Sequence, residues 1–159
     1  MVNVKLITVG NLKESYLREA AAEYVKRLGG FCKFEEVQLK EERVSDDPSE
    51  NEIRSVLDRE AQKILAEIPQ RSLKVAMCVE GRQYSSEELS LLIDRAAEER
   101  GEICLVIGSS HGLSESVKSA CDLRLSFSKL TFPHQLMKII LLEAIYRAFN
   151  ISKGTKYHK

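Results

Sequence analysis

Apolar and polar residues alternate along the chain with two periods, one typical of strands and the other typical of helices. Alternating β-branched and apolar residues at 2–9 predict a strand that Gly10 ends. Apolar residues three and four apart from Leu17 to Leu28 predict a helix, which stops at Gly29-Gly30. Strand-like alternation returns at 31–39. The first forty residues therefore predict a strand, a helix and a second strand.

The rest of the chain continues to alternate between the two periods. Asp47 should cap the next helix, because Pro48 and Glu50 stand where a first-turn proline and a capping-box glutamate belong. The expected elements are, in order, a helix from Asp47 to Pro69, a strand at 73–79 ended by Gly81, a helix from Ser85 to Gly101, a strand at 103–107, a short helix from Ser114, a strand at 123–127 and a helix from Pro133 to about Asn150.

Strands that alternate with helices predict an α/β fold. The runs at 73–79 and 103–107 are apolar enough to be covered on both faces, as central strands of parallel sheets are. We therefore expect one domain over 1–159, with a mainly parallel sheet of five to six strands and helices on both faces. Ligands of such sheets bind outside the carboxyl ends of the strands. The candidate site residues are then Glu80-Gly81, 108–112 and 126–132.

The composition is that of an ordinary globular protein, with 43% apolar and 30% charged residues. The cysteines are widely spaced without a C-x-x-C pair, which favours buried thiols over zinc ligands or disulfides. They are Cys32, Cys78, Cys104 and Cys121. Since we recognise neither a signal peptide nor an apolar run of about 20 residues, we expect a cytoplasmic protein without a membrane partner.

The formal net charge is zero, but the charges are unevenly distributed. Ten acidic residues face four basic ones between Glu35 and Glu60, whereas six basic residues face only Glu143 from Lys129 onward. The C-terminal part could form a basic surface that attracts an anionic ligand. A solvated helix face and tail would explain the same count.

Two strand-end loops could carry chemistry. The loop Gly108-Ser109-Ser110-His111-Gly112 can bring backbone N–H groups close to a ligand, although it has neither the P-loop nor the dinucleotide pattern. A tight turn with an exposed His111 is the alternative. The loop at 126–134 could enclose an adenine-like ring, or Phe127 and Phe132 could be core residues. His134, in the first turn of its helix, could be a neutral structural residue or a base.

The C-terminal region offers two further features. The helix at 135–146 is apolar almost all round, so it is either a buried core helix or is covered partly by another subunit. The last residues, Tyr157, His158 and Lys159, combine a ring that can stack, a proton acceptor and a cation, which together suit a nucleobase.

Four segments taken together resemble one known family. They are Ile-Gly-x-x-x-Gly-Leu at 107–113, Leu-Ser-Phe-Ser-Lys-Leu-Thr-Phe-Pro-His-Gln at 125–135, Leu-Leu-Glu-Ala-Ile-Tyr-Arg-Ala-Phe at 141–149, and the terminal Tyr-His-Lys. The chain resembles the ribosomal RNA large subunit methyltransferase H family, of the SPOUT class, over its whole length. It departs from the family at Ser109, where a second glycine is common, and at Ala144, where glutamine is common.

The resemblance implies a C-terminal deep trefoil knot over about 73–159, a homodimer, and no metal. It implies that S-adenosylmethionine is the methyl donor and that N3 of a pseudouridine in 23S rRNA is the acceptor. Carried over by position, the donor site comprises Met77, Gly108, Phe127, Ser128, Lys129, Leu130, Thr131 and Phe132.

The tail then becomes the candidate acceptor site. We expect His158 to act as base or orienting group, Lys159 to stabilise negative charge on the uracil ring and Tyr157 to pack against the base. Arg147 and Lys156 are expected to contact RNA, and a partner subunit could supply the tail to a donor pocket.

Two alternative functions remain at this point, a knotted transfer-RNA methyltransferase and a non-catalytic protein that binds ribosomes. The absence of an appended RNA-binding domain makes a small free RNA a less attractive substrate. Zero net charge also predicts weak general affinity for polyanions, so we expect an assembled ribosomal particle as substrate.

Overall fold

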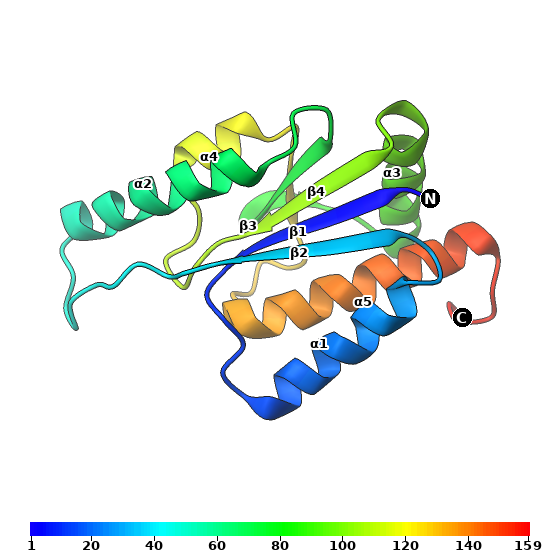
Figure 1. The fold of residues 1–159 in the computed structure, drawn as a ribbon, viewed down its shortest axis with the longest axis horizontal. Coiled ribbons are helices and arrows are strands. Elements are labelled where there is room, and N and C mark those ends of the chain that lie inside the picture. The colour runs from blue at the N-terminus through cyan, green and yellow to red at the C-terminus, as the bar shows by residue number, and fades with distance from the viewer.

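Five parallel strands form one sheet in a computed structural model that describes residues 1–159 (Figure 1). They are β1 (Asn3–Val9), β2 (Lys33–Leu39), β3 (Leu73–Gln83), β4 (Glu102–Ile107) and β5 (Leu123–Ser126). Their order across the sheet is β2-β1-β4-β3-β5, and every neighbouring pair is parallel. The α/β class is confirmed, with five strands rather than six.

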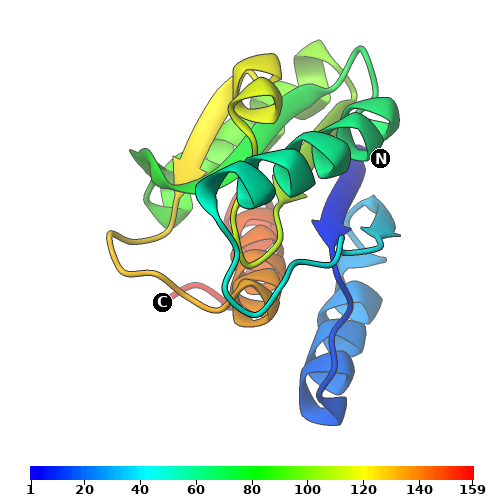
Figure 2. The same cartoon turned by 90° about the vertical axis from the view of Figure 1, so that its left-hand side faces the viewer.

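Helices cover both faces of the sheet, as expected (Figures 1 and 2). They are α1 (Ser15–Leu28), α2 (Glu50–Glu67), α3 (Ser86–Glu99), α4 (Glu115–Ala120) and α5 (His134–Lys153). The first, third and fifth helices pack on one face, and α2 and α4 pack on the other. None of the helices combines the length and the apolar character that crossing a bilayer requires.

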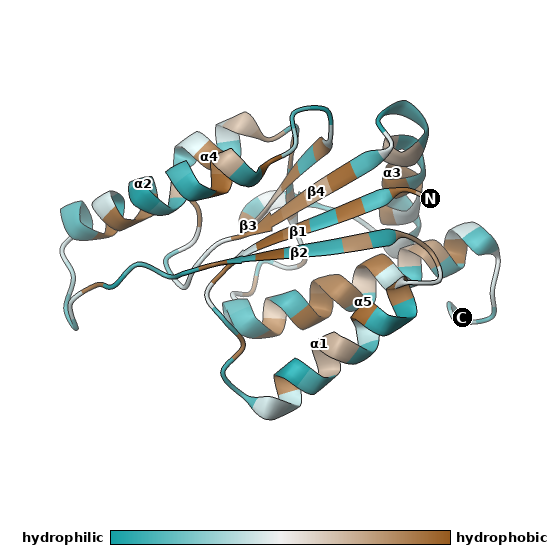
Figure 3. Ribbon diagram, in the orientation of Figure 1, coloured by the Kyte–Doolittle hydropathy of each residue, from teal (hydrophilic) through white to brown (hydrophobic).

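The side chains of β1 and β4 alternate between two cores, one beneath each helical layer. Figure 3 shows hydrophobic residues, in brown, along both strands. Leu105 belongs to the larger core under α1, α3 and α5, whereas its neighbour Val106 belongs to the smaller core under α2 and α4. Leu141, Leu142 and Ile145 of α5 are fully buried in the larger core. The two apolar strands that the sequence predicts as central, β3 and β4, are indeed neighbours inside the sheet.

The start of α2 differs from the prediction. Ser49, not Asp47, is the N-cap, and its hydroxyl accepts a hydrogen bond of 3.1 Å from the Glu52 N–H. The Glu52 carboxylate in turn accepts hydrogen bonds from the N–H and hydroxyl of Ser45. The segment before the helix is thereby folded back onto its first turn, which moves the cap two residues past Asp47.

The prediction that Gly81 ends β3 is also wrong, because the strand continues to Gln83. A Cβ on Gly81 would lie 2.7 Å from the carbonyl carbon of Arg124 in β5. The pairing of these two strands shifts register between Met77 and Arg82. Gly81 therefore permits a close backbone approach within the strand pair, as glycine often does in strands.

Helix α5 runs in the direction opposite to the strands (Figure 1). It begins at their carboxyl ends and ends beside their amino ends, where both chain termini lie. Its 20 residues correspond to about 30 Å at 1.5 Å per residue. The predicted donor-site loop lies next to its first turn, whereas the C-terminal tail folds back onto its middle, at Glu143 to Arg147.

Candidate functional site

A cavity of about 690 Å³ opens at the carboxyl ends of β3, β4 and β5. Its size lies within the range of small-molecule sites. Of the eight residues predicted for a donor site, seven line it: Met77, Gly108, Phe127, Ser128, Leu130, Thr131 and Phe132. Lys129 is exposed and does not line it. The cavity therefore opens at the edge of the sheet where the sequence predicts a binding site.

The glycine loop after β4 forms one wall and is packed too tightly for a side chain at Gly108. A Cβ there would lie 2.3 Å from the carbonyl oxygen of Gly112. Gly112 itself has a φ of +86° and donates its N–H to the Ser109 carbonyl at 2.9 Å. The loop is therefore a tight turn and a cavity wall at once, so the two interpretations of this motif do not exclude each other.

Ser109, where the family commonly has glycine, ties this loop to a buried carboxylate on α2. Its hydroxyl donates to Glu60 Oε1 at 3.0 Å, and Glu60 Oε2 accepts the Glu42 N–H at 3.2 Å. Only 2% of Glu60 is exposed, and this burial raises the pKa of its carboxyl. Sequence reasoning missed Glu60, because one glutamate on an amphipathic helix gives no sign of facing inward.

The segment between β5 and α5 is a long loop (Figure 2) that lines the cavity, and its own serines hold it. The Ser126 hydroxyl donates to the Ser128 carbonyl at 2.9 Å, and the Leu130 N–H donates to the Ser128 hydroxyl at 3.0 Å. Phe127 both packs against the larger core and lines the cavity, whereas Phe132 lines the cavity only. His111 and His134 also line it.

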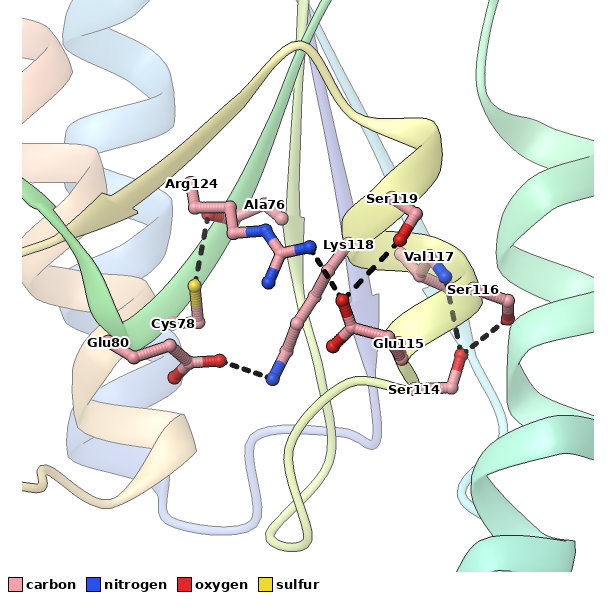
Figure 4. Close-up of polar contacts among 10 residues, drawn as sticks. All are labelled: Ala76, Cys78, Glu80, Ser114, Glu115, Ser116, Val117, Lys118, Ser119 and Arg124. Carbon is pink, nitrogen blue, oxygen red and sulfur yellow. Dashed lines mark hydrogen bonds and ion pairs between the residues drawn. The ribbon is translucent and has the colours of Figure 1, made fainter.

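Glu80 and Lys118 lie on the third side of the cavity, and they are paired with each other (Figure 4). The hydrogen bond from Lys118 lowers the pKa of the Glu80 carboxyl. A second pair, Arg124 with Glu115 at 2.7 Å, lies beside the first but outside the cavity lining. Glu80 stands among the predicted strand-end positions, whereas Lys118 belongs to no motif and was missed.

The tail residues are not loose but pack on α5. The Tyr157 hydroxyl donates to Glu143 Oε2 at 2.7 Å, and the Tyr157 ring lies edge-on to Tyr146 with centroids 4.8 Å apart. The Arg147 guanidinium lies over the Tyr157 ring, 4.7 Å from its centroid. Burial, assisted by Glu143, raises the pKa of Tyr157 to about 12. This phenol therefore stays protonated at physiological pH and acts as a hydrogen-bond donor.

Both ring nitrogens of His158 have partners. Nε2 lies 2.9 Å from Glu87 Oε1, and Nδ1 lies 3.3 Å from Arg147 Nη1. Arginine can only donate, so Nδ1 accepts and Nε2 carries the hydrogen that Glu87 receives. Lys156 and Lys159 are exposed. Figure 1 places this end of the chain far from the carboxyl ends of the strands.

The predicted C-terminal basic surface is smaller than the residue count suggests. Lys138 is buried and paired with Glu36 of β2, and Arg147 is paired with Glu143 at 2.7 Å. The Lys138–Glu36 pair joins the basic C-terminal segment to the acidic segment at 35–60. The Arg147–Glu143 pair lies within α5. No three His, Cys, Asp or Glu side chains converge where a metal ion could bind.

The chain matches one family model, described as "Predicted SPOUT methyltransferase", over residues 2–158. Ribosomal RNA large subunit methyltransferase H from Streptococcus thermophilus is 48% identical, over 99% of this chain and 100% of the relative. The proteins of the same name from Streptococcus sanguinis and Bacillus pumilus are 46% and 42% identical at the same coverage.

Among solved structures, one similar fold is the crystal structure of a "Probable Methyltransferase from Bordetella pertussis Tohama I". The TM-score is 0.57 at 19% identity, over 92% of this chain and 95% of the other. At this identity the likeness shows a shared fold.

Proposed function

Because this chain belongs to the SPOUT methyltransferase family, we propose that it methylates N3 of a pseudouridine in 23S ribosomal RNA with S-adenosylmethionine as donor. The observation that carries the proposal is the full-length match to relatives named for methylating large-subunit rRNA. The cavity at the strand ends supports it, since a methyltransferase needs a site for its donor.

The cavity residues fit this donor by shape and chemistry. Phe127, Phe132 and Leu130 offer apolar surface for a purine ring, and the Ser126–Leu130 backbone can read its edge. The missing side chain at Gly108 lets the loop fold tightly onto Gly112, so that its backbone forms the cavity wall that a ligand would meet. The bound donor would supply an electrophilic methyl group on its sulfonium. The protein would align donor and acceptor and accept the N3 proton.

The tail residues are proposed to act on the acceptor. N3 of the base must lose its proton as the methyl group arrives in line, so acceptor and donor have to be aligned. His158 offers Nδ1 as the proton acceptor once Arg147, which donates to Nδ1 at 3.3 Å, turns to the RNA, while its Nε2–H stays on Glu87. Lys159 stabilises negative charge on the ring oxygens, and Tyr157 packs against the base. Arg147 and Lys156 contact the RNA backbone.

We infer a homodimer with shared active sites from the position of the tail. The cavity is lined by the first turn of α5, whereas the tail packs on Glu143 to Arg147, roughly 14–20 Å further along the helix at 1.5 Å per residue, and no tail residue lines the cavity of its own chain. In a two-fold dimer with antiparallel α5 helices, the tail of one subunit would reach the cavity of the other. The half-buried residues of α5 support such a contact.

The family also implies a deep trefoil knot in residues 73–159, which we retain in the proposal. This part of the proposal rests on the family match over residues 2–158. Stretching the unfolded chain between its termini tests it. A knotted chain stays shorter than its contour length, and an unknotted chain reaches it.

Mass mapping of 23S rRNA tests the function. It compares rRNA from cells with and without the gene, and it compares ribosomes with naked rRNA after treatment with the purified protein. We expect the deletion strain to lack one methyl group on a pseudouridine of 23S rRNA, and the gene, acting in the cytoplasm, to restore it. In vitro, the purified protein should restore this methyl group on assembled particles only. Modification of transfer RNA would favour the alternative substrate. Ribosome binding without any donor binding would favour a non-catalytic protein, and efficient modification of naked rRNA would contradict the assembled substrate.

A further inference from the structure

The cavity at the strand ends contains only two charged side chains, Glu80 and Lys118. Every other lining residue is apolar, glycine, a hydroxyl residue, histidine or cysteine. The two charges have opposite sign, come from different elements and are paired with each other. A ligand with one positive and one negative group could therefore pair with Glu80 and Lys118 at the same point of the cavity.

The two pairs on this side of the sheet differ in where they point (Figure 4). Lys118 is largely enclosed, with 17% of its side chain exposed, and its partner Glu80 is 54% exposed. The first pair joins β3 to α4, and Arg124 with Glu115 joins the neighbouring strand β5 to the same helix, but neither of these two residues lines the cavity. The second pair can hold α4 in place whether or not the first pair is intact.

We propose that Lys118 and Glu80 bind the amino-acid end of the methyl donor, Lys118 taking its carboxylate and Glu80 its ammonium group. The inference rests on the proposed function for the identity of the donor. An α-amino acid carries a carboxylate and an ammonium on one carbon, which matches a neighbouring cation and anion in the protein. Hydrogen bonds between ionised groups are the stronger class, so this exchange provides affinity.

Opening the pair costs little in the free protein. Glu80 is 54% exposed and stays solvated when the pair opens, and the more enclosed Lys118 gains the carboxylate of the donor in exchange. After the exchange every charge is again paired, so no buried charge is left without a partner. The apolar walls and the Gly108 loop remain for the adenosine part, and the two ends of the donor are recognised separately.

Two product-like probes separate the two ends. S-adenosylhomocysteine keeps the amino-acid end, whereas 5′-methylthioadenosine lacks it, and neither carries the sulfonium charge. Calorimetric titration should show that the wild-type protein prefers S-adenosylhomocysteine. Lys118→Met should weaken binding of S-adenosylhomocysteine about tenfold, as expected for one charged hydrogen bond. Binding of 5′-methylthioadenosine should change less than about twofold.

Further variants control for folding and charge. Lys118→Arg keeps the cation and should restore most of the preference, and Glu80→Gln should reduce it less than Lys118→Met because Glu80 is more exposed. Arg124→Gln breaks the matched pair outside the cavity and should leave the preference unchanged. Thermal unfolding of each variant shows that it is folded.

The outcomes are distinct. If Lys118→Met weakens both probes equally, or weakens neither, the proposal is wrong. If the wild-type protein binds neither probe, the proposed donor is wrong, and this inference is wrong with it. Loss of preference in Lys118→Met alone, with binding of 5′-methylthioadenosine retained, supports the assignment.

Discussion

The cavity at the strand ends and the C-terminal tail are built by different means. The cavity is shaped by backbone, with the Gly108 loop packed so closely that one added carbon would lie 2.3 Å from a carbonyl oxygen. The tail is held by side chains that are partly exposed, such as Tyr157 on Glu143 and His158 on Glu87. Rigid backbone suits a ligand of constant shape. Exchangeable polar contacts suit a segment that must also meet RNA, so perturbing each region should affect a different step.

Removing the tail should have the largest effect on activity and almost none on the donor cavity. Truncation after Thr155 deletes the proposed base and its neighbours, so methylation of ribosomes should fall roughly 10²- to 10⁴-fold. Binding of S-adenosylmethionine, measured by titration, should survive. Unchanged methylation by the truncated protein would show that the tail is dispensable.

Mixed dimers sharpen the comparison by separating the two regions onto two chains. A Gly108→Ala chain and a chain truncated after Thr155 are each expected to be inactive alone. Co-expressed, they should regain about a quarter of wild-type activity, because half of the dimers contain one intact cavity opposite one intact tail. The purified mixed dimer should show about half of wild-type activity in a methylation assay, because one of its two sites is intact. A site formed within one chain predicts no recovery.

Gly108→Ala should damage the cavity without touching the tail. The added methyl group must displace the backbone of Gly112, so we expect a loss of about 1–3 kcal/mol in the free energy of unfolding. Donor binding should weaken at least tenfold in calorimetry. Gly101→Ala is the matched control, because Gly101 has a φ of +72° but nothing within 4 Å of an added Cβ. It should cost about 1–2 kcal/mol and leave binding intact.

Replacing Glu60 should produce the smallest effect, visible mainly as a change in pH dependence. Burial raises its pKa, so its contribution to stability is full below the unfolded pKa of about 4.3 and is lost as pH rises through the folded pKa. Glu60→Gln does not titrate. The wild-type free energy of unfolding, measured against this variant by denaturant titration, should therefore decrease as pH rises through that window. A difference independent of pH would contradict a buried carboxylate.

Periodicity was sufficient to predict the order of strands and helices and the edge of the sheet where the cavity opens, because both follow from local patterns and from general rules for parallel sheets. Contacts between distant segments could not be predicted in this way. Ser109 was recognised as a departure from the family, but its partner Glu60 lies 49 positions earlier. Gly81 was predicted to end a strand, because the sequence nearby gives no sign of the β5 backbone that requires a glycine there. That backbone is more than forty residues away in sequence.

The C-terminal residues illustrate the same limit in chemistry. Composition identified Tyr157, His158 and Lys159 as useful groups for a nucleobase, yet the hydrogen-bonding pattern of His158 depends on Glu87 of α3 and Arg147 of α5. Lys138 was counted as part of a basic surface, and the structure instead buries it against Glu36. Residue counts describe the charge that a segment carries but not which of those charges reach solvent.

The length of α5 has an evolutionary consequence. If one end of this 20-residue helix anchors the donor wall and the other end delivers the tail to a partner, its length sets the geometry of the shared site. Gaining or losing one turn would move the tail by about 5.4 Å, roughly ten times the tolerance of a catalytic arrangement. Related proteins should therefore accumulate insertions and deletions in the connection between β2 and α2, while α5 keeps its residue count even where its sequence diverges.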